Sequence, residues 1–281
     1  LPLSGSSDCY IDWGDGNIEY SKPSGAKYLY HKYDLQEVKN YVVVISGKVS
    51  SLSSHDLPAH SVIEVLQWGQ TGLTHMTYAF YGNTMLTAIC PDDMGAFSNV
   101  SLFVEAFSGC VNLKSVPSNL FRFCTNATNF SGTFYDCFGI TSIPSGLFAH
   151  CENATRFDNI FCNCSGITSI PSNLFANCFN VENFDYAFYN CNGITSIPLE
   201  LFANCPSVKS FASTFAFCKN IFSIPSELFT NCSNVTTFNL TFVGCKRLSS
   251  IPSSIFENCK KVTSFYSTFE GCTEATSESP Y

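Results

Sequence analysis

The feature that most constrains the fold is a phrase that recurs every 27 residues. The chain reads "ITSIPSGLFAHC" from Ile140, "ITSIPSNLFANC" from Ile167 and "ITSIPLELFANC" from Ile194. Self-similarity at a fixed period is typical of proteins in which each repeat forms one coil and stacks on its neighbours. The sequence therefore predicts a solenoid in which equivalent side chains lie above one another.

Prolines, cysteines and phenylalanines all follow this period. The proline column is Pro117, Pro144, Pro171, Pro198, Pro225 and Pro252. Seven of the sixteen cysteines form a first column, Cys110, Cys137, Cys164, Cys191, Cys218, Cys245 and Cys272, and six form a second, Cys124, Cys151, Cys178, Cys205, Cys232 and Cys259. Three phenylalanine columns begin at Phe103, Phe107 and Phe121. We expect these phenylalanines to form a stacked aromatic core.

Each repeat has two similar halves, which predict its local structure. The first residues of each half suit a short strand, and the stretch that ends at a cysteine suits one or two helical turns, with Pro198 and its column at a first helical position. Gly193 and Asn180 lie two residues after a cysteine, where a helix end often needs a positive φ. We therefore predict an α/β repeat solenoid of leucine-rich-repeat type, with short strands and short helical turns. Its continuous parallel sheet is expected along the β-branched "ITSI" segments.

The regular cysteine positions predict a structural role for the thiols. A residue at the inner end of a tight turn must be small and apolar, and buried cysteine behaves in this way. Disulfides between adjacent coils are the rival interpretation, because stacked positions fall within the allowed Cα separation. A metal site at "CNC", Cys162 to Cys164, is a weaker alternative.

The N-terminal part has a different pattern. "CYIDWGDGNIEY" reads as strand, turn and strand, and "KYLYHKYDLQEVKNYVVVISGKV" adds extended segments. We predict a small antiparallel β unit over residues 1–60 that caps a solenoid of about seven coils over residues 61–273, followed by a polar tail at 274–281.

Charge and motifs exclude several functions. The net charge is −8, which argues against a nucleic-acid partner, and no apolar run is long enough to span a membrane. None of the common catalytic or nucleotide-binding motifs occurs. Asp12 and Asp15 lack the EF-hand spacing, so a turn held by carboxylate–backbone hydrogen bonds is the preferred interpretation over a Ca²⁺ loop. The adjacent Asp92 and Asp93 are read as a helix start. We expect no catalytic residues, no metal and no cofactor.

Recognition through the solenoid surface is the remaining function. Aromatic residues replace polar ones at a few repeat positions in the middle coils, and such residues suit protein hot spots or stacking on sugars. The candidate ligand-binding residues are Tyr135, Phe138, Phe179, Tyr186 and Tyr189. Isolated surface aromatics, or aromatics packed between neighbouring coils, are the alternative interpretation.

The repeat phrase "LTSI…IP…AF…C" resembles the BspA-like leucine-rich repeats of bacterial surface proteins, over about residues 62–273. The segments "IDWGDG" and "HKYDLQEVKNYVVVISG" are similar to PKD-like strand pairs that precede such repeats in proteins of gut bacteria, although the segment is too short for a complete PKD domain. The 27-residue period is longer than is usual in this family, and phenylalanine takes the place of leucine.

The resemblance implies a non-enzymatic protein exported to the bacterial cell surface, often through a lipid anchor upstream of the sequence. It also implies adhesion or the binding of a host or matrix protein. A surface glycan-binding protein for nutrient capture and a structural spacer are the two other functions that we keep open.

Overall fold

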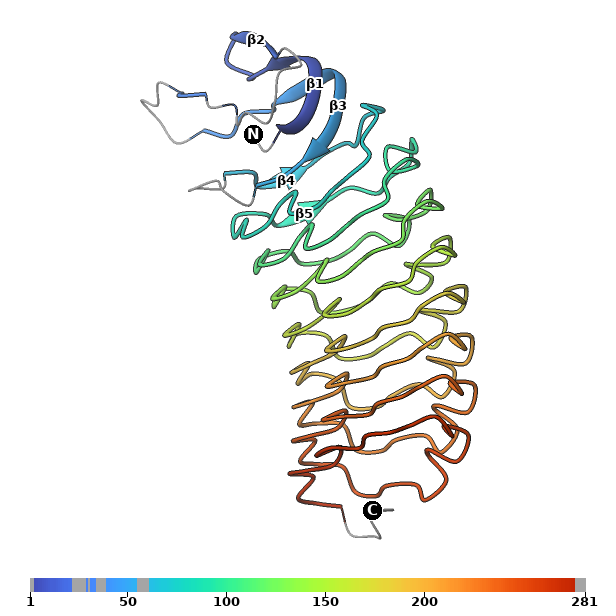
Figure 1. The fold of residues 1–281 in the computed structure, drawn as a ribbon. Helices are drawn as coiled ribbons and strands as arrows, with labels where there is room; N and C mark the ends of the chain where they lie inside the picture. Colours follow the sequence, from blue (N-terminus) through green and yellow to red (C-terminus); the bar gives the residue numbers. More distant parts are fainter. Residues whose placement is uncertain (1–2, 22–28, 30, 34–38, 55–60, 276–281) are drawn as a thin grey trace.

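A computed structural model of the chain describes residues 3–21, 29, 31–33, 39–54 and 61–275. Figure 1 shows a long stack of coils with the N-terminal strands at one end and the C-terminus at the other. Repetition along one axis is the architecture of a solenoid, as predicted. The strands are β1 (Leu3–Asp12), β2 (Ile18–Ser21), β3 (Val44–Leu52), β4 (Glu64–Val65) and β5 (Ala88–Ile89).

The first three strands form an antiparallel sheet in the order β2-β1-β3. β1 and β2 are joined by a tight turn in which Gly14 N–H donates to Asp12 Oδ1 at 2.9 Å and Asn17 N–H donates to Asp15 Oδ1 at 3.1 Å. Short carboxylates commonly hold turns in this way. The interpretation of Asp12 and Asp15 as turn residues is confirmed.

β3 also pairs with the first coil of the solenoid. Ser51 forms a parallel bridge with His75, Val49 N–H donates to Thr71 O, and Thr74 N–H donates to Ser50 O. The N-terminal sheet and the coils are therefore joined through one strand, as Figure 1 shows. The second strand track begins nearby with the parallel pair β4–β5.

A continuous column of parallel bridges runs through the solenoid. It links one residue per coil: His75, Leu102, Asn129, Arg156, Asn183, Ser210, Thr237 and Ser264. We call this column the bridge track. The prediction that "ITSI" would form the continuous sheet is wrong, because beyond β4–β5 that track has a single bridge, Ser196 to Ser223, among the described residues. A proline follows each "ITSI" directly and has no N–H with which to continue the ladder.

Turns take the place of the predicted helical segments. The described residues contain no helix, and backbone bonds span three residues, as from Cys191 N–H to Phe188 O and from Leu201 N–H to Pro198 O. Asp92 likewise begins a turn and not a helix. Its buried carboxylate accepts the N–H groups of Ala96 and Phe97 at 2.8 and 3.0 Å. The predicted α/β character is thus not found, since the coils consist of short extended segments joined by tight turns.

Left-handed backbone occurs, but not where the sequence predicted it. The residue just before each first-column cysteine and the residue five before it have positive φ, as at Asn190 and Tyr186 before Cys191. Gly193, two residues after that cysteine, does not have positive φ. A Cβ on Gly193 would lie 2.3 Å from Ile167 O, so close approach between coils, and not backbone conformation, requires glycine there.

Stacked aromatic rings fill the centre of the coils, as predicted. Rings in the columns that contain Phe103, Phe107 and Phe121 stack on their equivalents one coil away, as in Phe103–Phe130 at 5.2 Å and Phe175–Phe202 at 6.3 Å between centroids. All sixteen cysteines are free thiols, and all but Cys90 and Cys272 are buried. The interpretation of the cysteines as core thiols is therefore confirmed.

Candidate functional site

The predicted ligand-binding residues fall in three places on a coil. In the coil that starts at Val181 we call residues 185–190 the first turn, residues 192–193 the first corner and residues 206–207 the second corner, and we use the same names in the other coils. Tyr135, Tyr186 and Tyr189 lie in first turns, Phe138 lies in a first corner and Phe179 lies in a second corner. Phe138 and Phe179 are exposed, but no ring contact joins either to the tyrosines among the described residues.

Three aromatic side chains on adjacent coils do come together. The ring centroids of Tyr186 and Tyr189 are 5.6 Å apart, and Tyr189 meets Phe217 of the next coil edge-on at 5.4 Å. Tyr186 is 41% exposed and Phe217 is 38% exposed. We call Tyr186, Tyr189 and Phe217 the aromatic cluster. Phe217 was missed from the sequence, although it is the one aromatic residue in a column otherwise filled by glycine, asparagine and aspartate.

Two members of the cluster have an unfavourable backbone conformation. Tyr186 has φ 57° and Phe217 has φ 59°. The column of Phe217 otherwise holds only glycine, asparagine and aspartate, which suit this region. The column of Tyr186 includes Gly132 and Asn159, but also Tyr78, Glu105, Ser213, Leu240 and Ser267 with positive φ. A left-handed conformation costs a residue with a Cβ roughly 1–2 kcal/mol. Phe217 is therefore the exceptional residue of its column, whereas Tyr186 shares its conformation with other residues that carry a Cβ.

The half-buried tyrosines of the first turns flank a buried thiol. Tyr135, Cys162 and Tyr189 occupy equivalent positions in three successive coils. Burial raises the pKa of Cys162 to about 12, with a further contribution from the Asp136 carboxylate. Burial is also the main reason why the pKa values of Tyr135 and Tyr189 are raised. All three groups are therefore neutral at physiological pH.

Hydrogen-bonded polar side chains fix the backbone beside the cluster. Asn190 Nδ2 donates to Asn163 Oδ1 at 3.0 Å, and Asn163 Nδ2 donates to Asp136 Oδ1 at 2.7 Å in the coil before. Asn192 Nδ2 donates to Asn190 Oδ1 at 2.8 Å. Asn190 lies in the same first turn as Tyr186 and Tyr189, so these hydrogen bonds restrict the conformation of that turn.

A carboxylate at the start of the first turn, Asp185, is engaged within the fold. Asp185 Oδ1 accepts Ser210 Oγ–H at 2.5 Å and Ala212 N–H at 2.9 Å. Burial raises the pKa of Asp185, while its hydrogen bonds oppose that rise. Asp158, one coil earlier, forms an ion pair with Arg156 at 2.8 Å. Both carboxylates thus have structural partners.

The described residues also bear on the questions of a metal site and a membrane-spanning helix. No group of three or more His, Cys, Asp or Glu side chains in that part of the chain is placed to hold a metal ion. Cys164, one of the pair considered for a metal, donates its thiol to Phe134 O at 3.0 Å. Among the same residues no helix is long and apolar enough to cross a membrane.

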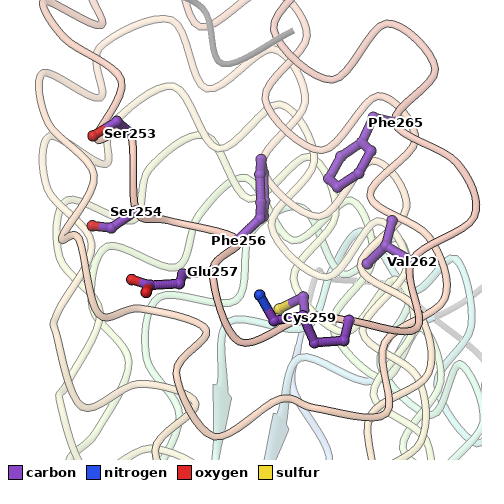
Figure 2. Close-up of a pocket in the computed structure, with 8 residues that line it drawn as sticks. Ser253, Ser254, Phe256, Glu257, Cys259, Val262 and Phe265 are labelled. Atoms are coloured by element: carbon purple, nitrogen blue, oxygen red, sulfur yellow. The ribbon is translucent and has the colours of Figure 1, made fainter.

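A hollow of about 500 Å³ lies at the C-terminal end of the stack. Figure 2 shows Phe256, Val262 and Phe265 around it, with Ser253, Ser254 and Glu257 at its edge. Phe256 and Phe265 are members of the core columns, and their ring centroids are 4.9 Å apart. The hollow is thus the open end of the aromatic core. None of the predicted ligand-binding residues lines it.

Comparison with known proteins places the repeats in a family. Residues 95–263 match six copies of the BspA type leucine rich repeat region. A search of curated proteins gives no match. Repeats of this type are typically non-enzymatic, are often found on bacterial surface or secreted proteins and are often involved in protein interaction. Since the matched region covers more than half of the chain, the protein belongs to the BspA-type leucine-rich-repeat family.

Proposed function

We propose that this chain is a non-enzymatic recognition protein of the bacterial cell surface that binds a host or matrix protein through the aromatic cluster. Membership of a repeat family that is often involved in protein interaction supports this function. The stacked core fixes the coils, so residues on the surface of the first turns can vary without loss of the fold.

The observation that carries the proposal is the conformation of Phe217. It is an exposed aromatic residue in a left-handed turn, in a column that otherwise holds only glycine, asparagine and aspartate. Strained residues that persist against a cheaper alternative are a reason to look for function. Phe217 contacts Tyr189, which contacts Tyr186, and clustered aromatic side chains with tyrosine among them are common in protein hot spots.

The experiment is a binding screen of the purified chain against arrayed matrix proteins, mucins and glycans. The double variant Tyr186→Gly/Phe217→Gly is screened in parallel. We expect a saturable protein ligand whose affinity falls by at least about tenfold in the variant, because two hot-spot side chains are removed. The thermal stability should change little, since the relief of left-handed strain offsets the greater chain entropy of unfolded glycine and the loss of ring contacts.

Tyr78→Gly is the matched control. Tyr78 has φ 58° at the equivalent position near the N-terminal end and pairs with Tyr81 much as Tyr186 pairs with Tyr189. This variant should keep full affinity. Binding retained by the double variant would place the site elsewhere, and the absence of any ligand for the wild-type chain would favour a structural spacer. A hit confined to glycans would favour the glycan-binding function.

A further inference from the structure

Three exposed cations gather at the first corners of the C-terminal coils. The column that holds Val111, Phe138, Ser165 and Asn192 in earlier coils continues with Lys219 and Lys246, and Arg247 follows directly. We call Lys219, Lys246 and Arg247 the basic corner. A local excess of cations in a chain of net charge −8 is unusual enough to need a reason.

The basic corner adjoins the aromatic cluster. Lys219 lies two residues after Phe217 in the same coil. A Cβ added to Gly244 would lie 2.6 Å from Cδ1 of Phe217, so the phenylalanine ring covers this glycine of the next coil. Lys246 lies two residues after Gly244. Lys219 and Lys246 therefore each follow, by two residues, a position that the Phe217 ring occupies or covers.

Backbone contacts hold the corner in place. Arg247 N–H donates to Lys219 O at 3.2 Å, and Lys219 N–H donates to Asn192 Oδ1 at 3.3 Å. Asn220 Nδ2 donates to Asn192 O at 2.7 Å. The Cα positions of the three cations are thus fixed relative to the cluster, while their side chains extend from the surface.

These cations have no carboxylate partner within the described residues. Two other lysines of the solenoid are engaged, since Lys209 Nζ lies 2.8 Å from Glu182 Oε2 and Lys261 Nζ donates to Asn234 Oδ1 at 2.6 Å. Glu274 follows Arg247 by one coil and donates its backbone N–H to Lys246 O at 3.1 Å, but its carboxylate forms no ion pair in the described structure. The basic corner can therefore accept anions from a ligand.

We propose that the partner bound at the aromatic cluster is a protein with an acidic segment, whose carboxylates contact Lys219, Lys246 and Arg247. This inference rests on the proposed function and specifies the chemistry of the partner. Complementary charge at the edge of an apolar contact speeds association and selects partners.

The ring orientations favour a protein segment over an anionic polysaccharide. Tyr186 and Tyr189 are inclined at 51°, and Tyr189 and Phe217 at 74°. The cluster therefore offers mixed faces and edges and not a coplanar platform on which successive sugar rings could stack. Apolar and aromatic side chains of a protein fit the angles between such rings.

The test uses polymers as probes in a fluorescence anisotropy titration. The labelled random copolymer of glutamate and tyrosine is the acidic probe, the copolymer of lysine and tyrosine is its charge-reversed control, and heparin is the anionic polysaccharide. We expect saturable binding of the acidic copolymer only. Its affinity should fall by about tenfold in Lys219→Gln/Lys246→Gln and should weaken as salt is added.

Lys260→Gln/Lys261→Gln is the matched control, because it removes the same charge from a second corner at the same end of the stack. This variant should bind the acidic copolymer like the wild type. Equal losses in both double variants would mean that only net charge matters and would overturn the proposal. Preferential binding of heparin, or no binding of the acidic copolymer, would also overturn it.

The same variants separate this inference from the proposed function. A protein ligand found in the screen that is lost in Tyr186→Gly/Phe217→Gly but bound normally by Lys219→Gln/Lys246→Gln would leave the proposed function in place and refute the acidic segment. A ligand lost in both variants would support both.

Discussion

At the scale of single residues, side-chain identity at a repeated position carries the most information. Phe217 has a ring where five equivalent residues are glycine or aspartate and two are asparagine. Its backbone still adopts the left-handed conformation of the column. The backbone of the coil therefore keeps the same conformation with phenylalanine as with glycine, asparagine or aspartate at this position. A departure of this kind marks a surface position at which the fold itself does not determine the residue.

The turn between β1 and β2 gives a residue-scale prediction. His31 Nε2 lies 2.7 Å from Asp15 Oδ2, and the His31 ring stacks on Trp13 at 4.9 Å between centroids. The hydrogen bond from His31 is the main reason why the pKa of Asp15 is lowered to about 2. This contribution to stability is present at pH values above the ordinary aspartate pKa and is lost as the pH falls through about 2.

His31→Phe should raise the pKa of Asp15 towards its ordinary value, because the ring stack is kept and the hydrogen bond is lost. The measurement is an NMR titration of the Asp15 carboxyl carbon in both proteins. Asp12, whose carboxylate accepts only a backbone N–H among the described residues, serves as the internal control. A pKa of Asp15 that stays near 2 in the variant would show that the backbone of the turn, and not His31, lowers it.

The sequence predicted part of the candidate site. Tyr186 and Tyr189 stand out because their columns also hold polar residues such as Asn159 and Glu270, and the structure brings both into one cluster with Phe217. Phe138 and Phe179 stand out equally in the sequence, but they lie at corners without ring contact to the cluster in the described structure. Column comparison finds exceptional residues, whereas their mutual distance depends on turn geometry that a repeat period does not contain.

At the scale of elements, hydrogen bonds between successive coils explain the two cysteine columns. The thiol of Cys191 donates to Phe161 O at 3.0 Å, and the other first-column thiols make the same contact at 2.9–3.2 Å. The second-column thiol of Cys178 lies 3.9 Å from Phe148 O. A small buried residue is thus needed in both columns, but only the first column uses the thiol as a close donor.

Serine substitution should distinguish the two columns. We expect Cys191→Ser to cost about 1 kcal/mol of unfolding free energy, because the hydroxyl can still donate to Phe161 O. Cys178→Ser should cost more, about 2–3 kcal/mol, because its hydroxyl is buried without a close acceptor. Chemical denaturation of both variants measures the difference. Equal costs would mean that the thiol contacts in the first column have no part in its preference for cysteine.

The element types were predicted less well than the stacking. Periodic cysteine, proline and phenylalanine indicated which side chains meet between coils, and these contacts are found. Apolar spacing of three and four suits both turns and helices, so the pattern predicts helices where the structure has turns. Left-handed residues such as Asn190 and Tyr186 interrupt the helical path at two points in each first turn. Asparagine at position 190 is a sequence signal for left-handed backbone, whereas tyrosine at position 186 is not.

At the scale of the whole molecule, the two ends of the stack differ. β3 covers the first coil and supplies hydrogen bonds to it. At the other end Phe256 and Phe265, the last members of two core columns, line a hollow, as Figure 2 shows. In a solenoid each coil is stabilised mainly by its neighbours, so a coil with one neighbour should open more readily than a coil with two.

Amide hydrogen exchange should report this asymmetry. The N–H groups of Leu240, Phe242 and Gly244 donate to the coil that follows them, at 2.8, 2.9 and 2.7 Å. The equivalent residues of the last coil are Ser267, Phe269 and Gly271, and their N–H groups have no acceptor among the described residues. We expect these three amides to exchange faster than their counterparts by a factor of at least about a hundred.

The outcome would also show what covers the end of the core. Equal protection of Gly271 and Gly244 at every protein concentration would contradict the prediction and would mean that another part of the chain supplies acceptors to the last coil. Protection that rises with concentration would instead indicate a second copy. Two identical ends that both present N–H donors in their first turns cannot satisfy one another, so we expect the fast exchange of Ser267, Phe269 and Gly271 to be independent of concentration.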